Sequence, residues 1–408
     1  MQPWPGLLTR YATSRLIPLA LTTALTTAIT ASTSVVEIDT VLVKVASRCN
    51  INCTYCYVYN MGDDGWRDMP SLISVDTISA LCVALQNLTA DQVRPFAIVL
   101  HGGEPLMMGS RRLAHLLQCL RAATAAHQEI SIQTNGVLLT ASVLDICATH
   151  RVSISVSVDG PAEINDKFRI GKRGEGTYDR VAEGVRLLRE HPQSDFLFAG
   201  LLSVVNPMSD ARTVYDHLKG MGAHSIDFLY RDGNHAKLPF GKASFESTEY
   251  AEWFCELLDV YLSDPAPPKV RFLDDLIKLS MGGSGVKEGL GQTEYGIAII
   301  ETNGLIAKND TLKSSFDGAD KFISQWSVHS HRLSEVFKTG EFASYHSLQK
   351  PSSDTCLSCK HLAVCGGGMP LHRWKSETGY KNPSVYCEDQ KMLINRIRER
   401  LVTAGVVT

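Results

Sequence analysis

Apolar runs rich in β-branched residues alternate with amphipathic stretches from Val41 to about residue 264. Six runs predict strands: VLVKVAS, FAIVLHGGE, ISIQTN, VSISVSVDG, FLFAGLLSVVN and SIDFLYRDG. Apolar residues recur at helical spacing over residues 74–88, 110–126, 178–190 and 248–262. Strands joined through helices run parallel, so we expect an α/β fold, a partial (β/α)6 barrel with its site at the strands' carboxyl ends.

The pattern changes after the fourth helical stretch. A PAPPK segment breaks the regularity, and from Gly296 short strands such as those in IAIIETNGLIAKND precede a cysteine-rich tail. We therefore expect an N-terminal extension (1–36), the barrel (37–264), a linker (265–295), a smaller C-terminal domain (296–395) and a tail (396–408). A chain of 408 residues is long enough for a large core and a second, smaller one.

The charge balance gives no sign of a polyanionic partner. The chain has 40 basic and 43 acidic residues, a net charge of -3, so we expect neither nucleic acid nor a membrane as a partner. Arg10 and Arg15 precede an apolar run over residues 16–31 that is similar to a signal peptide. Its threonines make it too polar for a membrane span, and we expect an extension on a cytoplasmic protein.

Cysteine usage favours metal ligation over disulfides. Seven of the eleven cysteines lie in two short-spaced groups, which suits metal sites and a reducing compartment. In the first group, Cys49, Cys53 and Cys56 supply three thiolates from one loop, which leaves one iron of a [4Fe–4S] cluster open. The alternatives are a zinc site, which lacks a fourth ligand at suitable spacing, or chance clustering. A disulfide-bonded secreted protein is a further alternative, motivated only by the N-terminal run.

The cysteine loop and the Gly-Gly-Glu segment that ends the second predicted strand resemble the radical S-adenosylmethionine (SAM) superfamily, over about residues 41–395. The resemblance implies that SAM fills the open iron and that its reductive cleavage yields a 5′-deoxyadenosyl radical. It implies SAM contacts from Tyr55, Gly102, Gly103, Glu104, Ser157, Arg169 and Leu202.

Other interpretations of some of these residues stay open. Arg169 is also explained as a solvated surface charge, and Leu202 and Val204 as ordinary core residues. Gln133 and Asn135 point to the same barrel mouth, but an Asn-Gly pair equally closes a turn.

The second cysteine group resembles a SPASM domain. Cys356, Cys359, Cys365 and Cys387 supply four thiolates, enough to saturate a cluster. The fuller family pattern has two further cysteines, at positions held here by Asn309 and Met369. We therefore expect one auxiliary [4Fe–4S] cluster, and a tetrathiolate zinc site is the alternative. The remaining cysteines are interpreted as buried free thiols: Cys82, Cys119, Cys147 and Cys255.

Three longer stretches resemble the FxsB and GrrM group of peptide maturases: VASRCNINCTYCYVYNMGDDGWR, IETNGLIAKNDTLKSSF, and CGGGMPLHRW followed by NPSVYC. The resemblance implies a ribosomally made precursor peptide, abstraction of a side-chain β-hydrogen, and a carbon–carbon bond to an aromatic ring, forming a cyclophane. An external one-electron reductant of the flavodoxin or ferredoxin type is implied. Asp232 is our candidate general base. The alternative interpretation of Asp232 is that it only stabilises a turn with Gly233. Asp310 is a weaker candidate for the base.

Competing functions stay open at this point. Other peptide-radical reactions are thioether formation, epimerisation with Cys255 as hydrogen donor, and formylglycine formation in sulfatases. The missing cysteines at 309 and 369 count against the last, because the family enzyme uses two auxiliary clusters. A non-catalytic iron–sulfur or zinc binding protein would cleave no SAM. With about forty residues before the first strand, we expect the peptide to dock on the barrel, on the second domain or on residues 1–36.

Overall fold

The computed structural model describes residues 36–406, so the signal-like run at 16–31 and nearly all of the expected N-terminal extension lie outside the described residues. One nine-stranded sheet forms the framework, in the order β7-β6-β5-β4-β3-β2-β1-β8-β9. Its strands are β1 (Thr40–Ala46), β2 (Ala97–Gly102), β3 (Ile130–Thr134), β4 (Ser153–Ser157), β5 (Phe198–Val204), β6 (Ser225–Leu229), β7 (Lys269–Val270), β8 (Ile297–Ile300) and β9 (Ile306–Ala307).

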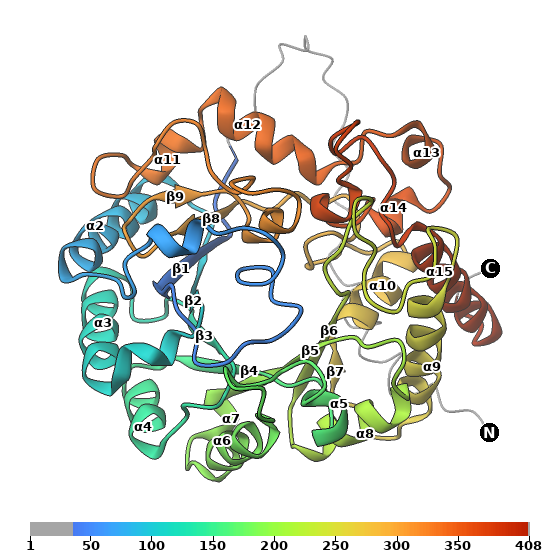
Figure 1. The fold of residues 1–408 in the computed structure, drawn as a ribbon, viewed down its shortest axis with the longest axis horizontal. Coiled ribbons are helices and arrows are strands. Elements are labelled where there is room, and N and C mark those ends of the chain that lie inside the picture. The colour runs from blue at the N-terminus through green and yellow to red at the C-terminus, as the bar shows by residue number, and fades with distance from the viewer. Residues whose placement is uncertain (1–35, 407–408) are drawn as a thin grey trace, which may run out of the picture.

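The first six strands confirm the six predicted runs. They pair in chain order and in parallel, and among the described strands only β8 and β9 pair antiparallel. In Figure 1 the strands form the inner wall, the helices lie outside, and the loop after β1 lies within the ring. The described sheet ends at β7 and β9, so the predicted partial barrel is confirmed.

Helices cover the outer face of the sheet. The predicted helical stretches are confirmed as α2, α3, α6 and α9, and the Ser74 hydroxyl caps α2 by accepting from the Thr77 amide. Within the described residues no helix has the length and apolar character needed to cross a membrane. The helices are α2 (Val75–Asp91), α3 (Gly109–Ala123), α4 (Ala141–Thr149), α5 (Ala162–Asn165), α6 (Tyr178–Glu190), α7 (Ser194–Leu197), α8 (Ala211–Gly220), α9 (Glu249–Ser263), α10 (Arg271–Ser280), α11 (Leu333–Val336), α12 (Gly340–His346), α13 (Asp354–Leu357), α14 (Leu362–Cys365) and α15 (Cys387–Thr403).

The segment after residue 264 is tied to the barrel more closely than the sequence indicates. The stretch 265–295, expected as a linker, contains β7 and α10, and β7 extends the sheet beyond β6. Strand β8, expected in the C-terminal domain, pairs in parallel with β1. The reason is physical: the apolar IAII run satisfies backbone groups at the β1 edge that would otherwise lack partners. The proposed domain boundaries therefore mark changes of pattern along a continuous sheet.

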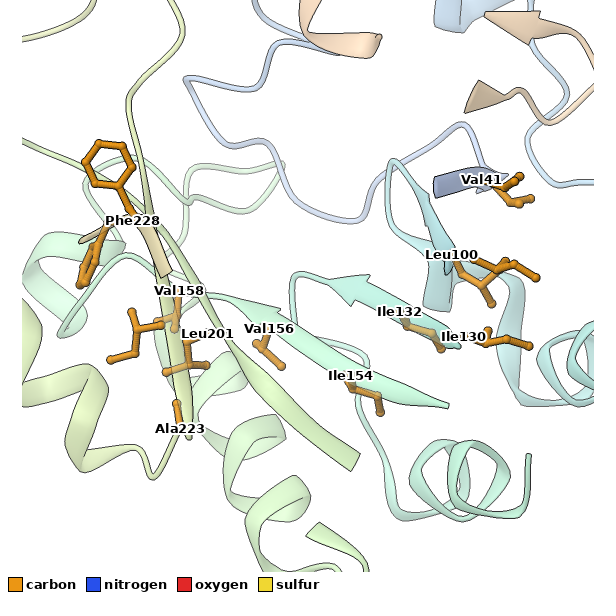
Figure 2. Close-up of a cluster of buried hydrophobic side chains, with 14 of the residues drawn as sticks. Val41, Leu100, Ile130, Ile132, Ile154, Val156, Val158, Leu201, Ala223 and Phe228 are labelled. Carbon is orange, nitrogen blue, oxygen red and sulfur yellow. The ribbon is translucent and has the colours of Figure 1, made fainter. Parts of the chain in front are cut away.

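The core explains which strand residues reach the site. Along β2, β3 and β4, fully buried residues alternate with partly exposed ones, as a pleated strand requires. Figure 2 shows apolar side chains from several strands gathered in one cluster, including Leu100, Ile132 and Val156, all at most 1% exposed. The alternate positions carry His101, Gln133 and Ser157 at the carboxyl ends of these strands.

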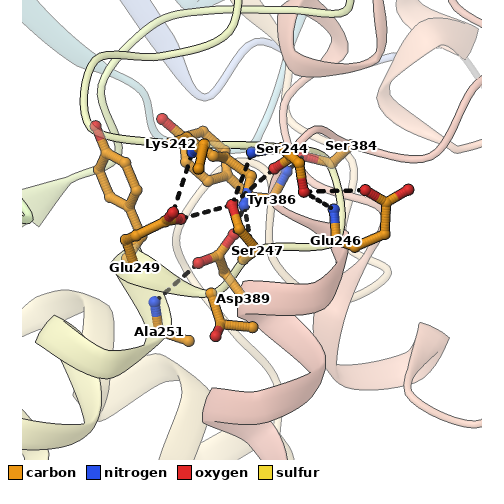
Figure 3. A network of polar contacts seen from close by, with 12 residues as sticks. Lys242, Ser244, Glu246, Ser247, Glu249, Ala251, Ser384, Tyr386 and Asp389 are labelled. Carbon is orange, nitrogen blue, oxygen red and sulfur yellow. Dashed lines mark hydrogen bonds and ion pairs between the residues drawn. The ribbon is translucent and has the colours of Figure 1, made fainter.

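A buried ion pair joins the connection after β6 to the C-terminal helix (Figure 3). Lys242 Nζ lies 2.7 Å from Asp389 Oδ2 of α15, and both side chains are fully buried. The other Asp389 oxygen accepts from the Ala251 amide at 2.9 Å, and Lys242 also donates to the Ser247 carbonyl. Burial on this scale is tolerated because every charge in the pair has a partner.

Candidate active site

A cavity of about 320 Å³ lies at the carboxyl ends of the barrel strands. Gln133, Asn135 and Val204, which the sequence left open, face this same cavity. All eleven residues that the sequence assigned to the open cluster, the SAM contacts and the base line it: Cys49, Cys53, Cys56, Tyr55, Gly102, Gly103, Glu104, Ser157, Arg169, Leu202 and Asp232.

Main-chain hydrogen bonds hold the cysteine loop from both sides. The Asn52 amide donates to the Ile170 carbonyl at 2.8 Å, and the Thr54 amide donates to the Phe168 carbonyl at 2.9 Å. On the other side, the Glu104 amide donates to the Arg48 carbonyl at 2.9 Å. The loop is thus held between the segment that carries Arg169 and the Gly-Gly-Glu segment.

The two glycines of that segment are required by the chain's own packing. A Cβ on Gly102, whose φ is +139°, would lie 2.0 Å from the Ala46 carbonyl oxygen. A Cβ on Gly103 would lie 2.1 Å from the Tyr59 hydroxyl and 2.3 Å from the Arg48 carbonyl oxygen. In both cases a close neighbour is the backbone at the start of the cysteine loop, so the missing side chains let the two segments approach each other.

Gly103→Ala is expected to disrupt this loop. The new methyl group must displace the Arg48 backbone as well as the Tyr59 hydroxyl, so we expect a destabilisation of about 2 kcal/mol or more and a large loss of iron from the first cysteine group. Urea denaturation and iron analysis measure the two effects. Gly220→Ala, where a Cβ meets no atom within 4 Å, is the matched control and should be neutral. A normal iron content in Gly103→Ala would contradict the prediction.

Glu104 ties the ends of β2 and β3 together. Its Oε1 accepts from the Thr134 hydroxyl at 2.7 Å and from the Leu106 amide at 3.0 Å, and its Oε2 accepts from the Asn135 amide at 2.8 Å. Burial raises the pKa of this carboxyl, which the hydrogen bonds oppose. Asn135 in turn directs its side-chain amide at the Cys49 Sγ, at 3.6 Å.

Arg169 is buried and part of a network. It is 5% exposed, which excludes its interpretation as a solvated surface charge. Its Nη1 donates to the Tyr55 hydroxyl at 2.9 Å, and that hydroxyl donates to Asp159 Oδ2 at 2.6 Å. Its buried Nε has no partner among the described residues. A buried donor left free beside the cysteine loop fits an anionic or hydroxyl-bearing ligand.

Sequence reasoning missed two charged residues of this network. Asp159 is 4% exposed and accepts from the Val204 amide at 3.0 Å as well as from Tyr55. Arg231 stacks over the Tyr55 ring, with its Cζ 4.9 Å from the ring centre. Both stand next to residues that the sequence did single out, Asp159 in SVDGP and Arg231 in RDGN, and their position at strand ends was the available signal.

The cysteine groups are not arranged for a single ion. All eleven cysteines are free thiols, which argues against a disulfide framework. We compared the distances between possible ligand atoms of His, Cys, Asp and Glu within residues 36–406. In one group of three, Glu301, Asp310 and Asp320, these atoms all lie within 4.8 Å of one another, and no cysteine belongs to it. Tetrahedral zinc needs sulfurs about 3.8 Å apart, so neither cysteine group is closed around one zinc, whereas a cluster needs wider spacing.

Burial keeps the first thiols protonated when nothing is bound. It raises the pKa of Cys49 to about 12 and that of Cys56 to about 11, with neighbouring thiols adding to the shift. Thiolates form here only where positive charge replaces the protons, as iron does.

The second cysteine group comes from three helices and a connection: Cys356 lies in α13, Cys359 follows it, Cys365 ends α14 and Cys387 begins α15. Burial, together with neighbouring Cys387, Cys356 and Cys359, raises the pKa of Cys365 to about 12. Arg373 is 1% exposed, and burial lowers its pKa to about 10. The neighbouring Cys356 and Cys365 thiols act in the opposite direction and raise this pKa. Sequence reasoning missed this buried cation. The remaining cysteines were expected to be buried, but only Cys147 is fully so, while Cys82, Cys119 and Cys255 are half-buried.

Asn309 and Met369, which stand where the fuller family pattern has cysteines, both contact the neighbouring residues Glu288 and Gly289. Asn309 Nδ2 lies 2.9 and 3.1 Å from the two Glu288 carboxylate oxygens. A Cβ on the adjacent Gly289 would lie 2.9 Å from the Met369 sulfur. A carboxylate–amide pair and a thioether therefore stand where the fuller family pattern has thiols.

The two base candidates differ in surroundings. Asp232 forms no hydrogen bond with its turn in the described chain; its Oδ1 lies 3.9 Å from His372 Nε2, and burial raises its pKa to about 7. Asp310 instead lies 2.5 Å from Lys44 Nζ, which also binds Glu301 at 2.6 Å. Asp310 thus shares a lysine with Glu301, whereas the charge of Arg231 only partly opposes the effect of burial on the pKa of Asp232.

Residues 43–211 match the family model described as the radical SAM superfamily. The chain contains a radical SAM domain. That domain spans β1 to the start of α8 and holds the cysteine loop, the Gly-Gly-Glu segment and Arg169.

Relatives match well beyond the radical SAM domain. A cysteine-type anaerobic sulfatase-maturating enzyme of Clostridium perfringens is 22% identical over 371 residues, 89% of this chain and 97% of its own. A serine-type anaerobic sulfatase-maturating enzyme of Bacteroides thetaiotaomicron is 24% identical over 371 residues, 85% of each chain. These relatives do not support the narrower resemblance to the FxsB and GrrM group.

Solved structures share the fold. Native anSMEcpe with bound AdoMet has a TM-score of 0.75 at 21% identity, covering 90% of this chain and 100% of its own. Streptococcus suis SuiB bound to precursor peptide SuiA has a TM-score of 0.58 at 13% identity, covering 87% and 77%. The radical SAM domain and the C-terminal segment thus follow an arrangement found in known proteins.

Proposed function

We propose that this chain is a radical SAM enzyme that oxidises a side chain of a peptide or protein substrate. The observation that carries the proposal is the single cavity lined by three cysteines of one loop, a Gly-Gly-Glu segment and the buried Arg169. Their donor set fits the cofactor: three thiols for iron, and a free buried guanidinium Nε for the ligand of the fourth iron.

Each residue has a proposed role in binding. Cys49, Cys53 and Cys56 would hold the [4Fe–4S] cluster, and with SAM bound that cluster would supply the reductive cleavage that gives a 5′-deoxyadenosyl radical. The chain's other residues orient SAM and exclude water, and the Arg169, Tyr55 and Asp159 network fixes one wall of the cavity. The proposed SAM contacts are Tyr55, Gly102, Gly103, Glu104, Ser157, Arg169 and Leu202.

Cys356, Cys359, Cys365 and Cys387 would hold a second cluster, and such a cluster would offer an exit for an electron. Four thiols leave it no open iron for substrate, and the buried guanidinium of Arg373 offsets part of its negative charge. The initiating electron comes from a one-electron reductant of the flavodoxin or ferredoxin type. The cytoplasmic location stays a prediction from cysteine usage.

The proposed reaction acts at a β-carbon. One hydrogen leaves as an atom, which converts the deoxyadenosyl radical to 5′-deoxyadenosine, and a second leaves as a proton while one electron passes to an acceptor. The sulfatase-maturating relatives support formylglycine formation, in which water then replaces the sulfur of an oxidised cysteine. The non-cysteine residues at 309 and 369 keep carbon–carbon cross-linking, the cyclophane reaction, as the second candidate.

We propose Asp232 as the acceptor of that proton. Only the carboxylate form accepts a proton, so with a pKa of about 7 we expect product formation to rise with pH through about 7 and then level off. Asp232→Asn should lower product formation about 100-fold and remove this pH dependence, while SAM cleavage continues. Product and 5′-deoxyadenosine, quantified together across the pH range, separate the two steps. An unchanged profile in Asp232→Asn would exclude the role.

Mass spectrometry tests the function directly. The iron-loaded enzyme, a reductant and SAM are incubated with cysteine- and serine-containing peptides and with any small peptide encoded beside the gene. Loss of two hydrogens with fragmentation blocked across a segment indicates a cross-link. Replacement of cysteine sulfur by oxygen with loss of two hydrogens, and reaction of the product with hydrazine, indicates formylglycine. Failure to form 5′-deoxyadenosine under these conditions would overturn the proposal.

A further inference from the structure

Tyr230 stands in the wall between the active-site cavity and a second cavity of about 320 Å³. The second cavity lies between the end of β6, the start of α10, residues 286–290 and the segment before α15. Four residues line both cavities: Leu229, Tyr230, Asp232 and Thr311. Tyr230 is the only aromatic residue among these four, so its ring is the conjugated group that both spaces share.

Tyr386 extends this wall toward the second cysteine group. Its ring centre lies 4.2 Å from that of Tyr230, with the two planes 32° apart, so the rings are in face-to-face van der Waals contact. Phe254 and Phe272 also contact Tyr230, but at 5.0 and 5.5 Å and with planes 60° and 89° apart. Tyr386 directly precedes Cys387, the first residue of α15. A stacked pair of rings therefore connects the active-site cavity with a cysteine of the second group.

The second cavity offers no thiols that could bridge the same gap. In the described chain no cysteine lines it, whereas Glu288 and Met369 do, and the Asn309 amide lies 2.9 Å from the Glu288 carboxylate. The fuller family pattern has cysteines at positions 309 and 369, as ligands of a first auxiliary cluster. An electron that leaves the substrate therefore has to reach the second cysteine group without stopping at an intervening cluster.

The two phenol groups are not placed for proton transfer. The Tyr230 hydroxyl is buried without a hydrogen-bond partner among the described residues, and the Tyr386 hydroxyl donates to the Arg231 carbonyl, which takes up no proton. Burial raises the pKa of both phenols well above its usual value, and the nearby Cys365 thiol adds to the shift of Tyr230. Because a tyrosine that keeps its proton is hard to oxidise, these rings suit a bridge for an electron better than a tyrosyl radical.

We propose that the stacked rings of Tyr230 and Tyr386 form the path by which one electron passes from the substrate to the second cysteine group. The inference rests on the proposed function for the presence of a substrate radical. After one hydrogen atom has gone to the deoxyadenosyl radical and one proton to Asp232, the substrate carries one unpaired electron, and loss of that electron gives the closed-shell product. The electron is accepted by a [4Fe–4S] cluster at the second cysteine group and leaves through an external carrier of the flavodoxin or ferredoxin type. Both tyrosines stay neutral and protonated throughout.

Electron exchange without a peptide tests the path apart from catalysis. Formate radicals from a radiolysis pulse reduce the oxidised, iron-loaded enzyme substoichiometrically, and absorbance follows the redistribution of the electron between the two cysteine groups. Tyr230→Leu and Tyr386→Leu each remove one ring and should lose most of the fast redistribution, whereas Tyr230→Phe and Tyr386→Phe keep the rings and should retain it. Phe254→Leu is the matched control, because it removes a ring that contacts Tyr230 but belongs to α9. It should behave like the wild type.

A single turnover tests the same pair with the substrate as the electron donor. Freeze-quench EPR follows the reaction with SAM and a cysteine-containing peptide, and the variant that lacks Cys49, Cys53 and Cys56 provides the spectrum of the second cluster alone. The wild type should show that spectrum as product forms. The two leucine variants should instead accumulate an organic radical while 5′-deoxyadenosine still forms.

Stability measurements separate a broken path from a misfolded chain. Iron content and the midpoint of urea denaturation are compared for every variant. Tyr386 is 1% exposed, whereas Tyr230 is half-buried, so Tyr230→Leu decides the question if Tyr386→Leu fails to fold.

Equal redistribution in the wild type and the folded leucine variants would overturn the inference. The same loss in Phe254→Leu, or in the two phenylalanine variants, would also overturn it, because packing or the hydroxyl would then be the cause. If redistribution depends on the two rings and no 5′-deoxyadenosine forms, the proposed function alone fails. If product forms and neither leucine variant alters the redistribution or the EPR spectra, the electron path alone fails.

Discussion

Replacing Cys49, Cys53 and Cys56 together by alanine is expected to abolish SAM cleavage and to halve the iron content. The wild-type chain should hold about eight irons in two clusters, and the variant about four. The three thiols line the cavity and no other cysteine does, so no substitute ligand is at hand among the described residues. Iron and sulfide analysis with quantification of 5′-deoxyadenosine measures both effects.

The complementary variant separates the two cysteine groups. Cys356→Ala and Cys359→Ala should also reduce iron, but the first loop stays intact, so SAM cleavage is expected to persist while product formation falls. About twelve irons in the wild type would instead indicate a third cluster. Zinc in place of iron at either group would contradict the cluster assignment, as would SAM cleavage by the triple variant.

Lys242→Met is expected to destabilise the chain by about 3 to 5 kcal/mol. The substitution leaves the Asp389 carboxylate fully buried, with the Ala251 amide as its remaining partner in Figure 3. Burial already raises the pKa of Asp389 against the effect of Lys242, so without the lysine the carboxyl must take up a proton or remain an unpaired charge. The midpoint of urea denaturation at constant iron content measures the loss.

An exposed ion pair provides the matched control. Arg186 pairs with Glu183 and Glu190 on α6, with its side chain 51% exposed, and Arg186→Met should change stability by less than about 1 kcal/mol. Lys242→Met combined with Asp389→Leu should recover much of the loss, since both charges are removed. Equal, small effects of Lys242→Met and Arg186→Met would show that the buried pair contributes little.

Local patterns carried most of the fold prediction. The six strands and four of the helices follow from periodicity over five to seventeen residues, and Ser74 caps its helix as its residue type predicts. The spacing of Cys49, Cys53 and Cys56 is equally local, so one loop brings the three thiols together wherever the rest of the chain lies. The alternation along β2 to β4 also placed His101, Gln133 and Ser157 on the cavity side.

Other features were decided only by the tertiary structure. Strand β8 pairs with β1 although more than 250 residues separate Asp39 from Gly296. The Tyr55–Asp159 hydrogen bond joins residues 104 positions apart. Arg169 becomes part of the site because it is buried where the segments that carry these two residues meet. The reasons for Gly102 and Gly103, the Lys242–Asp389 pair and the second cavity likewise depend on which distant segments meet.

The difference has one physical cause. A strand, a helix or a ligand triplet is specified by interactions within a few residues, and these leave a periodic trace in the sequence. Burial, pKa and the pairing of charges depend on the solvent that distant segments exclude, and no short stretch records it. The sequence alone therefore determined the barrel strands and the cluster loop of this protein, and the tertiary structure decided which charges are buried, which are paired and which polar atoms remain free for a ligand.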